Sequence, residues 1–526
     1  MSSNETLAVA LDRATALYGE REAVADGDTR WSYRELEAKV SAFDRGLDDL
    51  GCQAGDVVGV LALNSAAHLV AWLAIPRSGR VLNDLNVRLA PAELEFILND
   101  SSTKVLLVDD AHRAIGEQLE QLCPGIKHVV HLGATEAPAG WRSFAELTGG
   151  PGRPAAAVDP DAVAGIFYTG GTTGLPKGAM LTHCNLVANA KHALILLRYD
   201  EADSYLHAAP MFHLANGASV FALTWVGGRH VVIPSFDPGL WLATVAQEAV
   251  TRALLVPTMI NMVVNHPAAG DTDLSSLRSV VYGGSPIPTA VLTAAMRLLD
   301  ADFSQAYGMT EASPLVSSLS PEDHRRGAAG EEPFAGRLRS AGRPIVGVDA
   351  QVFGPGGERC GDGEIGEVWV RGDNIMAGYW KREEETASAL DAEGWYHTGD
   401  AAYRDADGYL FIVDRVKDMM ISGGENVYST EVENAISSHD AVLECAVFGV
   451  PDERWGERVH AAIVGKPGAQ IDEDMIVAHL RERIAGYKLP RSIDFHDEPL
   501  PKSGAGKLLK RVLREPFWSG RERQVS

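Results

Sequence analysis

Residues 168–178 read YTGGTTGLPKG, a short segment that combines glycines, threonines and one lysine. Glycine lets the backbone turn close to a ligand, and successive N–H groups in such a turn attract an anion. The threonine hydroxyls add donors, and Lys177 adds positive charge. The segment therefore predicts a loop that binds a polyphosphate, although the same residues alone also suit a surface turn. It differs from the usual P-loop, because Pro176 precedes the lysine and Gly178 follows it.

The residues around this loop alternate between short apolar runs and longer amphipathic stretches. The run 163–167 predicts a buried strand before the loop, and residues 181–197 predict a helix after it. Further strands are expected at 57–63, 105–108, 129–132, 230–233, 253–256 and 279–282, and helices at 31–37 (with Ser32 as N-cap), 240–250 and 289–299. This alternation indicates an α/β fold whose parallel, doubly wound sheets are covered by helices.

The pattern changes twice toward the C-terminus. Residues 350–371 alternate around glycines and predict a small antiparallel or barrel-like element. Beyond residue 414 the pattern predicts a compact α+β unit, with helices at 429–438 and 473–484 and strands at 446–450 and 460–464. We expect a large N-terminal domain of residues 1–414 and a small, mobile C-terminal domain of residues 415–526.

Length and charge restrict the class of protein. A chain of 526 residues is expected to form two or more domains. The net charge of −24 argues against nucleic acid as a partner, so a phosphate site must be made positive locally, by amides, a lysine and a divalent ion. There is no apolar run that could span a bilayer and no secretory signal, and the five cysteines are scattered singly. We expect a cytoplasmic protein. The sequence does not specify its oligomeric state, and a homodimer is one option.

The segment QAYGMTE (residues 305–311) places an aromatic ring, a hydroxyl and a carboxylate within five positions. Tyr307 can stack on a base, and Thr310 can donate a hydrogen bond to a phosphate. Glu311 can hold a hard cation through oxygen. Taken alone, the segment also suits the end of a strand with a solvated glutamate.

Three more segments carry polar groups that suit a nucleotide. GWYHTGD (394–400) ends in Asp400, which can accept hydrogen bonds from both ribose hydroxyls, or can form an Asx turn. LPKSGAGK (500–507) places Lys507 at the end of a glycine loop, which also suits an exposed basic tail. DRVKD (414–418) is a charge run, and most such runs are solvated.

Taken in order, residues 168–177, 305–311, 394–400, 414–418 and 502–507 resemble the signature motifs of the adenylate-forming superfamily, over nearly the whole chain. Residues 417–428 (KDMMISGGENVY) and 210–213 (PMFH) resemble its fatty-acyl and aryl-CoA ligase branch. The chain departs from the usual pattern at Gly170, where most members have serine, and at Ser285 and Ser429, where alanine and proline are common.

The resemblance implies roles for the matching residues. For ATP it implies phosphate contacts from Thr169, Gly170, Gly171, Thr172, Thr173, Gly174, Lys177 and Thr310, adenine-side contacts from Ser285, Ala306 and Tyr307, ribose contacts from Asp400 and Arg415, and Mg²⁺ on Glu311. For the acid it implies His213, Tyr282, Gly283, Gly284, Gly308 and Met309, and for CoA it implies Gly423, Gly424 and Trp455. Lys507 would bridge the carboxylate and the α-phosphate, and Lys417 would be the hinge between the domains.

The implied reaction has two steps. A carboxylate attacks the α-phosphate of ATP, pyrophosphate leaves, and the acyl-adenylate that forms carries AMP as a good leaving group. Positive charge must lie where negative charge develops. The C-terminal domain would then swing about Lys417 so that CoA can reach the same carbonyl. Transfer to a carrier protein, an amine or another small nucleophile is one alternative, and a catalytically dead binding protein is another. The acid is left open between aliphatic and aryl acids.

Overall fold

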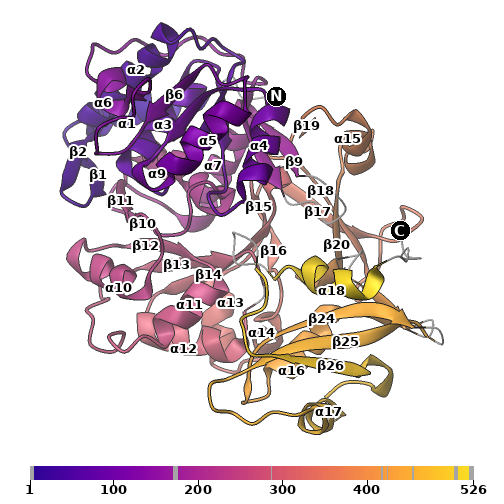
Figure 1. The fold of residues 1–526 in the computed structure, drawn as a ribbon. Helices are drawn as coiled ribbons and strands as arrows, with labels where there is room; N and C mark the ends of the chain where they lie inside the picture. Colours follow the sequence, from indigo (N-terminus) through magenta and orange to yellow (C-terminus); the bar gives the residue numbers. More distant parts are fainter. Residues whose placement is uncertain are drawn as a thin grey trace.

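The structure is a computed structural model that describes residues 5–169, 176–285, 287–415, 419–422, 425–452, 455–481, 483–502 and 508–519, of which residues 415, 421, 425, 426 and 456 are described by their backbone alone. Over these residues the strands form four sheets. Two large sheets and a small one make up the N-terminal part, and the C-terminal unit lies beside them (Figure 1). The expected α/β fold with a smaller C-terminal α+β unit is confirmed.

The sheet that carries the glycine-rich loop has eight strands among the described residues, in the order β19-β9-β8-β4-β3-β5-β6-β7. Strands β8 to β6 in this order run parallel, whereas β9 is antiparallel to both β8 and β19. The strands are β3 (Val57–Leu61), β4 (Val81–Asp84), β5 (Thr103–Val108), β6 (His128–His131), β7 (Arg142–Ser143), β8 (Val163–Thr169), β9 (Lys177–Thr182) and β19 (Gly378–Tyr379).

The helix expected at 181–197 begins two residues later than predicted. Residues Lys177–Thr182 form β9, which returns along β8, and helix α7 covers His183–Leu197. The Thr182 side chain accepts a hydrogen bond from the Asn185 amide and so caps the helix. The residues on either side of the loop therefore belong to two antiparallel strands, β8 and β9, rather than to a strand and a helix.

The second large sheet has nine strands in the described part of the chain, in the order β16-β15-β14-β13-β12-β10-β11-β1-β2. Its central strands are parallel, and antiparallel strands form both edges. The strands are β1 (Glu22–Asp26), β2 (Thr29–Ser32), β10 (Ser204–His207), β11 (Arg229–Val232), β12 (Arg252–Leu255), β13 (Ser279–Gly283), β14 (Asp302–Gly308), β15 (Leu315–Leu319) and β16 (Arg343–Pro344).

Helices fill the space between the two large sheets and cover their outer faces. Every residue of α3 is buried, because this helix is apolar on nearly all sides and packs in the largest core cluster, which joins both sheets. Ser32 caps α2 with a capping box, as expected. The inner helices are α1 (Ala8–Tyr18), α2 (Tyr33–Asp49), α3 (Ala66–Arg77), α7 and α9 (Ser219–Val226), and the outer ones include α4 (Pro91–Asp100), α5 (Arg113–Leu122), α10 (Pro238–Gln247), α11 (Pro257–Val264) and α12 (Thr289–Leu299).

The element expected at 350–371 is part of an antiparallel sheet of four strands, as far as the described residues show. The Trp369 ring stacks between two others on this sheet. Its centroid lies 4.2 Å from that of Phe353 and 3.9 Å from that of His397. The strands are β17 (Val348–Phe353), β18 (Gly366–Gly372), β20 (Tyr396–Arg404) and β21 (Leu410–Arg415), and the shorter helices of the N-terminal part are α6 (Phe144–Thr148), α8 (Leu214–Gly217), α13 (Pro321–Ala328), α14 (Phe334–Arg337), α15 (Glu383–Ala389), η1 (Asp110–His112) and η2 (Thr310–Ala312).

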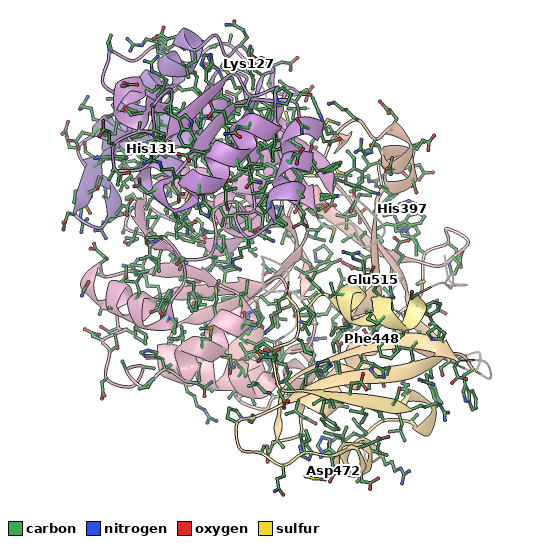
Figure 2. The ribbon with its side chains drawn as sticks, viewed as in Figure 1. Lys127, His131, His397, Phe448, Asp472 and Glu515 are labelled. Carbon is green, nitrogen blue, oxygen red and sulfur yellow. The ribbon has the colours of Figure 1, made fainter. Side chains whose placement is uncertain are left out.

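The C-terminal unit packs helices on both faces of its own sheet, and its two apolar clusters contain only residues from Met420 onward. Phe448 lies on the face of the sheet that α18 covers, with its ring 6.0 Å from that of Phe517 (Figure 2). The elements are β22 (Met420–Ser422), β23 (Glu425–Val427), β24 (Val442–Asp452), β25 (Gly456–Gly465), β26 (Ser492–His496), α16 (Ser429–Ser437), α17 (Glu473–Arg481), η3 (Gly486–Lys488) and α18 (Lys510–Trp518). No helix among the described residues has the length and apolar character needed to cross a membrane.

Candidate active site

The two ends of the glycine-rich loop lie opposite each other. Thr169 ends β8 and Lys177 begins β9, and they are register partners in the hairpin. The Thr169 hydroxyl lies 3.5 Å from Oε1 of Glu311, which brings the loop beside the QAYGMTE segment. Residues 170–174, to which we assigned the phosphate contacts, lie outside the described residues.

Glu311 is the centre of this arrangement. It follows β14 in η2, its side chain is buried, and Oε1 accepts a hydrogen bond of 3.0 Å from the Tyr379 hydroxyl. The Lys177 ammonium lies 5.4 Å from the centroid of the Tyr379 ring. We call Thr169, Lys177, Glu311 and Tyr379 the Glu311 cluster. Sequence reasoning missed Tyr379, because β19 comprises only Gly378–Tyr379 and has no periodicity to identify it.

The Glu311 carboxylate suits a magnesium ion that arrives with a nucleotide. It is only 9% exposed, and within the described chain its oxygens meet two hydroxyls and no cation. A buried carboxylate without a cationic partner is costly. The described residues contain no group of three or more acidic, histidine or cysteine side chains that could hold a metal alone. Mg²⁺ commonly binds through one or two carboxylates together with substrate phosphates, and Glu311 fits that mode.

Tyr307 and Asp400 meet although they come from different sheets. The Tyr307 hydroxyl on β14 donates to Oδ2 of Asp400 on β20 over 2.7 Å. The Asp400 amide donates to Oγ1 of Thr398 at 3.0 Å, within an irregular part of β20 where its pairing with β18 shifts register. Asp400 is also the register partner of Arg415, whose side chain lies outside the described atoms. The base-stacking and ribose-binding residues of the prediction are therefore neighbours.

Glycines at the ends of β13 and β14 allow close contacts with neighbouring backbone. Gly283 is the register partner of Ala306, and a Cβ on Gly283 would lie 2.2 Å from the Ala306 carbonyl oxygen. A Cβ on Gly308 would lie 1.7 Å from the Pro314 carbonyl oxygen, which accepts a 3.0 Å hydrogen bond from the Met309 amide. Gly284 and Ser285 continue from β13, and Gly284 has a φ of +82°. Ligands of open α/β sheets bind at such carboxyl ends of parallel strands.

The Tyr282 side chain is buried in a core cluster to which no member of the Glu311 cluster belongs. It is 1% exposed within the core beneath β13, and its hydroxyl pairs with Nε2 of His324 at 2.9 Å. The His324 Nδ1 pairs with the Ser320 carbonyl oxygen at 2.7 Å. Burial lowers the pKa of His324 to about 4. The predicted acid contact of Tyr282 stays a prediction, and its side chain stabilises the strand that carries Gly283.

This buried histidine predicts a loss of stability in acid. The folded pKa of His324 lies below its ordinary value of 6.5, so the unfolded chain binds the proton first as the pH falls. Stability is then lost from pH 6.5 down to pH 4. Between pH 7 and pH 5 the single site accounts for about 2 kcal/mol. Urea unfolding would measure the free energy of unfolding at pH 7 and at pH 5. The decrease between the two pH values should be smaller in His324→Gln than in the wild type by this amount. Equal drops in the two proteins would contradict the assignment.

His213 is positioned by two buried asparagines that the sequence analysis did not single out. His213 caps α8, with Nδ1 3.3 Å from the Ala215 amide. Asn64 donates to the carbonyl oxygens of His207 and Ala209 at 3.2 and 2.9 Å, and accepts from the Met211 amide at 2.8 Å. Asn216 donates to the Ala209 oxygen at 2.7 Å. The segment that leads to His213 is therefore fixed by one side chain from the loop after β3 and by another from α8.

Trp455 lies in the C-terminal unit. Its amide donates to Oδ1 of Asp452 at 3.0 Å, and the Arg491 guanidinium carbon lies 4.4 Å from its ring centroid. A cation held at this distance from an indole is a favourable cation–π pair. The predicted hinge and CoA residues Lys417, Gly423 and Gly424, and the predicted catalytic Lys507, lie outside the described residues.

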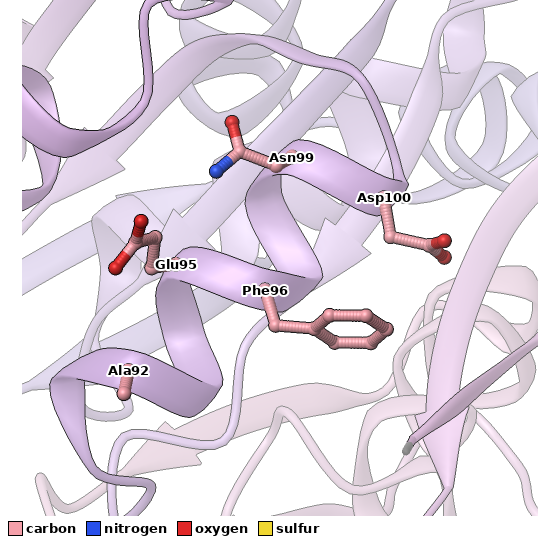
Figure 3. Close-up of a pocket in the computed structure, with 5 residues that line it drawn as sticks. All are labelled: Ala92, Glu95, Phe96, Asn99 and Asp100. Carbon is pink, nitrogen blue, oxygen red and sulfur yellow. The ribbon is translucent and has the colours of Figure 1, made fainter.

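A shallow hollow of about 470 Å³ lies beside α4 and is lined by Ala92, Glu95, Phe96, Asn99 and Asp100. Figure 3 shows the Phe96 ring and the Asp100 carboxylate extending to the same side of the helix. Asp100 is engaged by Tyr168 at 2.6 Å and by Arg382 at 3.0 Å. The lining carries two carboxylates and no cation, so it does not suit a polyphosphate.

The chain belongs to the family of AMP-binding enzymes, within the adenylate-forming superfamily. The AMP-binding enzyme domain matches residues 11–380, and the AMP-binding enzyme C-terminal domain matches residues 431–507. The resemblance drawn from the motifs is confirmed.

Its relatives are ligases that act on carboxylic acids. Feruloyl-CoA synthase from an Amycolatopsis species is 42% identical over 498 residues, or 94% of this chain and 96% of that protein. The fatty acid–[acyl-carrier-protein] ligase ScoC of Streptomyces coeruleorubidus is 35% identical over 509 residues, which is 94% of this chain and 93% of that protein. The structure of o-succinylbenzoate CoA synthetase (MenE) from Bacillus subtilis, in complex with the acyl-adenylate intermediate OSB-AMP, matches with a TM-score of 0.83 at 29% identity. The match covers 96% of this chain and 97% of that chain.

Proposed function

We propose that this protein is an AMP-forming acyl-CoA synthetase, which activates a carboxylic acid with ATP and transfers the acyl group to CoA. The observation that carries this proposal is that Tyr307 and Glu311, at the end of β14, contact side chains from two other sheets. Glu311 contacts Thr169 and Tyr379 of the eight-stranded sheet, and Tyr307 contacts Asp400 of the four-stranded sheet. The relatives that share nearly the full length of the chain support the same reaction.

Each part of this arrangement has a chemical task in the first step. Asp400 would accept the ribose hydroxyls and Tyr307 would lie against adenine, so that the nucleotide enters with its phosphates toward Thr169 and Lys177. Mg²⁺ on Glu311 would neutralise phosphate charge. Thr310 would donate to the α-phosphate, and Lys507 would hold it beside the carboxylate. These groups place positive charge where negative charge grows, which is commonly the largest contribution to catalysis.

The second step would need the C-terminal unit to move. We place the boundary between residues 414 and 415 and the hinge at Lys417. The Ser429 amide donates to Oδ2 of Asp414 over 2.6 Å, which joins the start of α16 to the last strand before the proposed hinge. Gly423, Gly424 and Trp455 would then receive CoA.

The acid is best sought first among aryl-substituted acids, because the 42% identical relative is named for feruloyl-CoA. We would supply ATP, Mg²⁺ and CoA with ferulate, benzoate, octanoate or palmitate, and measure AMP release. Acid-dependent exchange of labelled pyrophosphate into ATP would report adenylation without CoA. A protein that gives neither exchange nor an acyl-adenylate with any acid would refute the proposal.

Transfer to a carrier protein is the second candidate, since the 35% identical relative is named for that acceptor. The two candidates share adenylation and differ only in the final thiol. Acid-dependent AMP release that rises with free CoA would favour the synthetase. Release that rises only with a phosphopantetheinylated carrier protein would favour the alternative.

A further inference from the structure

Tyr379 contacts both charged side chains of the Glu311 cluster. Its hydroxyl donates to Oε1 of Glu311 at 3.0 Å, and its ring lies 5.4 Å from the Lys177 ammonium, which is within cation–π range. A hydrogen bond also joins the hydroxyls of Tyr379 and Tyr396. One side chain therefore links the carboxylate and the cation that we assign to magnesium and phosphate.

The protons of this small network can point in only one direction. An ionised carboxylate accepts hydrogen bonds but does not donate them, so the single phenolic proton of Tyr379 must be directed at Glu311. The Tyr379 oxygen then accepts the proton of Tyr396. The Glu311 carboxylate is thus held by a donor with a fixed orientation.

The backbone around Tyr379 is tied to the strand that begins at Lys177. In the β9–β19 ladder, the Ala377 amide donates to the Met180 oxygen at 2.9 Å, and the Trp380 amide donates to the Gly178 oxygen at 2.8 Å. The Tyr379 amide donates to Oγ1 of Thr386 at 2.9 Å. Tyr379 and Lys177 are therefore held together by the pairing of β9 with β19. Glu311 joins this pair through its side chain and through its carbonyl oxygen, which accepts from the Met376 amide at 2.8 Å.

We propose that Tyr379 is a positioning residue, whose hydroxyl orients Glu311 toward the magnesium of MgATP and whose ring holds the Lys177 ammonium beside the phosphate loop. The proposal rests on the proposed function, because it assumes that ATP binds at the Glu311 cluster. It assigns different tasks to two parts of one side chain, and substitutions can separate them.

The test is calorimetric titration of ATP into the full-length protein, with Mg²⁺ or with EDTA. In Tyr379→Phe the ring remains and the hydroxyl is lost. We expect the gain in ATP affinity that Mg²⁺ gives to fall about tenfold, which is the lower end of the loss when a group that orients a metal ligand is removed. Affinity in EDTA should be unchanged. Tyr379→Leu also removes the ring, so ATP affinity should fall in EDTA as well.

Tyr409→Phe is the matched control, because the Tyr409 hydroxyl also donates to a buried carboxylate, Asp323, at 2.7 Å, away from the cluster. In this variant, Mg²⁺ should raise the affinity for ATP as much as it does in the wild type. If Mg²⁺ raised the ATP affinity of Tyr379→Phe as much as that of the wild type, this proposal alone would be overturned. A wild-type protein that binds no ATP would overturn the proposed function. Should Tyr379→Phe fail to fold, Tyr396→Phe decides: a reduced magnesium gain supports the proposal, and an unchanged one overturns it.

Discussion

Replacing Lys507 with alanine is expected to lower the rate of acyl-adenylate formation by about 10²- to 10³-fold, the usual loss when one preorganised charge-stabilising donor is removed. The first step joins two anions, and Lys507 is the only cation that our proposal places between the carboxylate and the α-phosphate. Exchange of labelled pyrophosphate into ATP, measured with a saturating acid, reports this step. The second step does not need that charge, so thioester formation from supplied acyl-adenylate and CoA should continue.

Lys502→Ala is the matched control for this substitution. Lys502 lies on the same segment and forms a salt bridge with Glu444 on the surface of the C-terminal unit. Its loss should leave both half-reactions within about twofold of the wild type, since partly exposed ion pairs contribute little. If Lys507→Ala lost both half-reactions while its unfolding transition matched that of the wild type, Lys507 would not have the role proposed for the first step.

The sequence predicted the elements whose signals are local. Helix α12 has the expected bounds, and the Ser32 cap follows from a serine three residues before a glutamate. Strand β9 was not predicted, and its last two residues were assigned to the following helix, because the strand depends on pairing with β8 across the loop. In general, whether a segment forms a strand depends more on the strands packed beside it than on the intrinsic β-propensity of its residues.

The candidate site shows the same limit. Glu311 and Asp400 lie in sequence motifs that can be recognised from their residues alone. The side chains that contact them come from distant parts of the chain. Tyr379 reaches Glu311 only because β19 pairs with β9, about two hundred residues earlier in the chain. Asn64 holds the backbone before His213 through carbonyl groups, which carry no side-chain signal in a sequence. Contacts of this kind follow from the fold and could not be predicted before it.

Replacing Lys417 with proline should block the second step while the first step continues. The proposed hinge lies between β21, which ends at Arg415, and β22, which begins at Met420. Proline fixes φ near −65°, so the chain would lose the rotation that carries the C-terminal unit from one step to the other. We expect the transfer to CoA to fall about 10²-fold, a loss that misplacement of reacting groups can cause, with pyrophosphate exchange retained.

The comparison with Lys417→Ala separates rotation from charge. Alanine removes the ammonium but keeps the backbone free, so that variant should transfer the acyl group to CoA far better than the proline variant. Both proteins would be assayed for pyrophosphate exchange and for acyl-CoA formation from ATP, acid and CoA. A proline variant that loses exchange and transfer in equal measure would place the defect in folding or in nucleotide binding. Equal transfer by the two variants would show that the movement does not depend on the backbone at Lys417, and the hinge would then have to lie elsewhere between the last strand of the N-terminal part and α16.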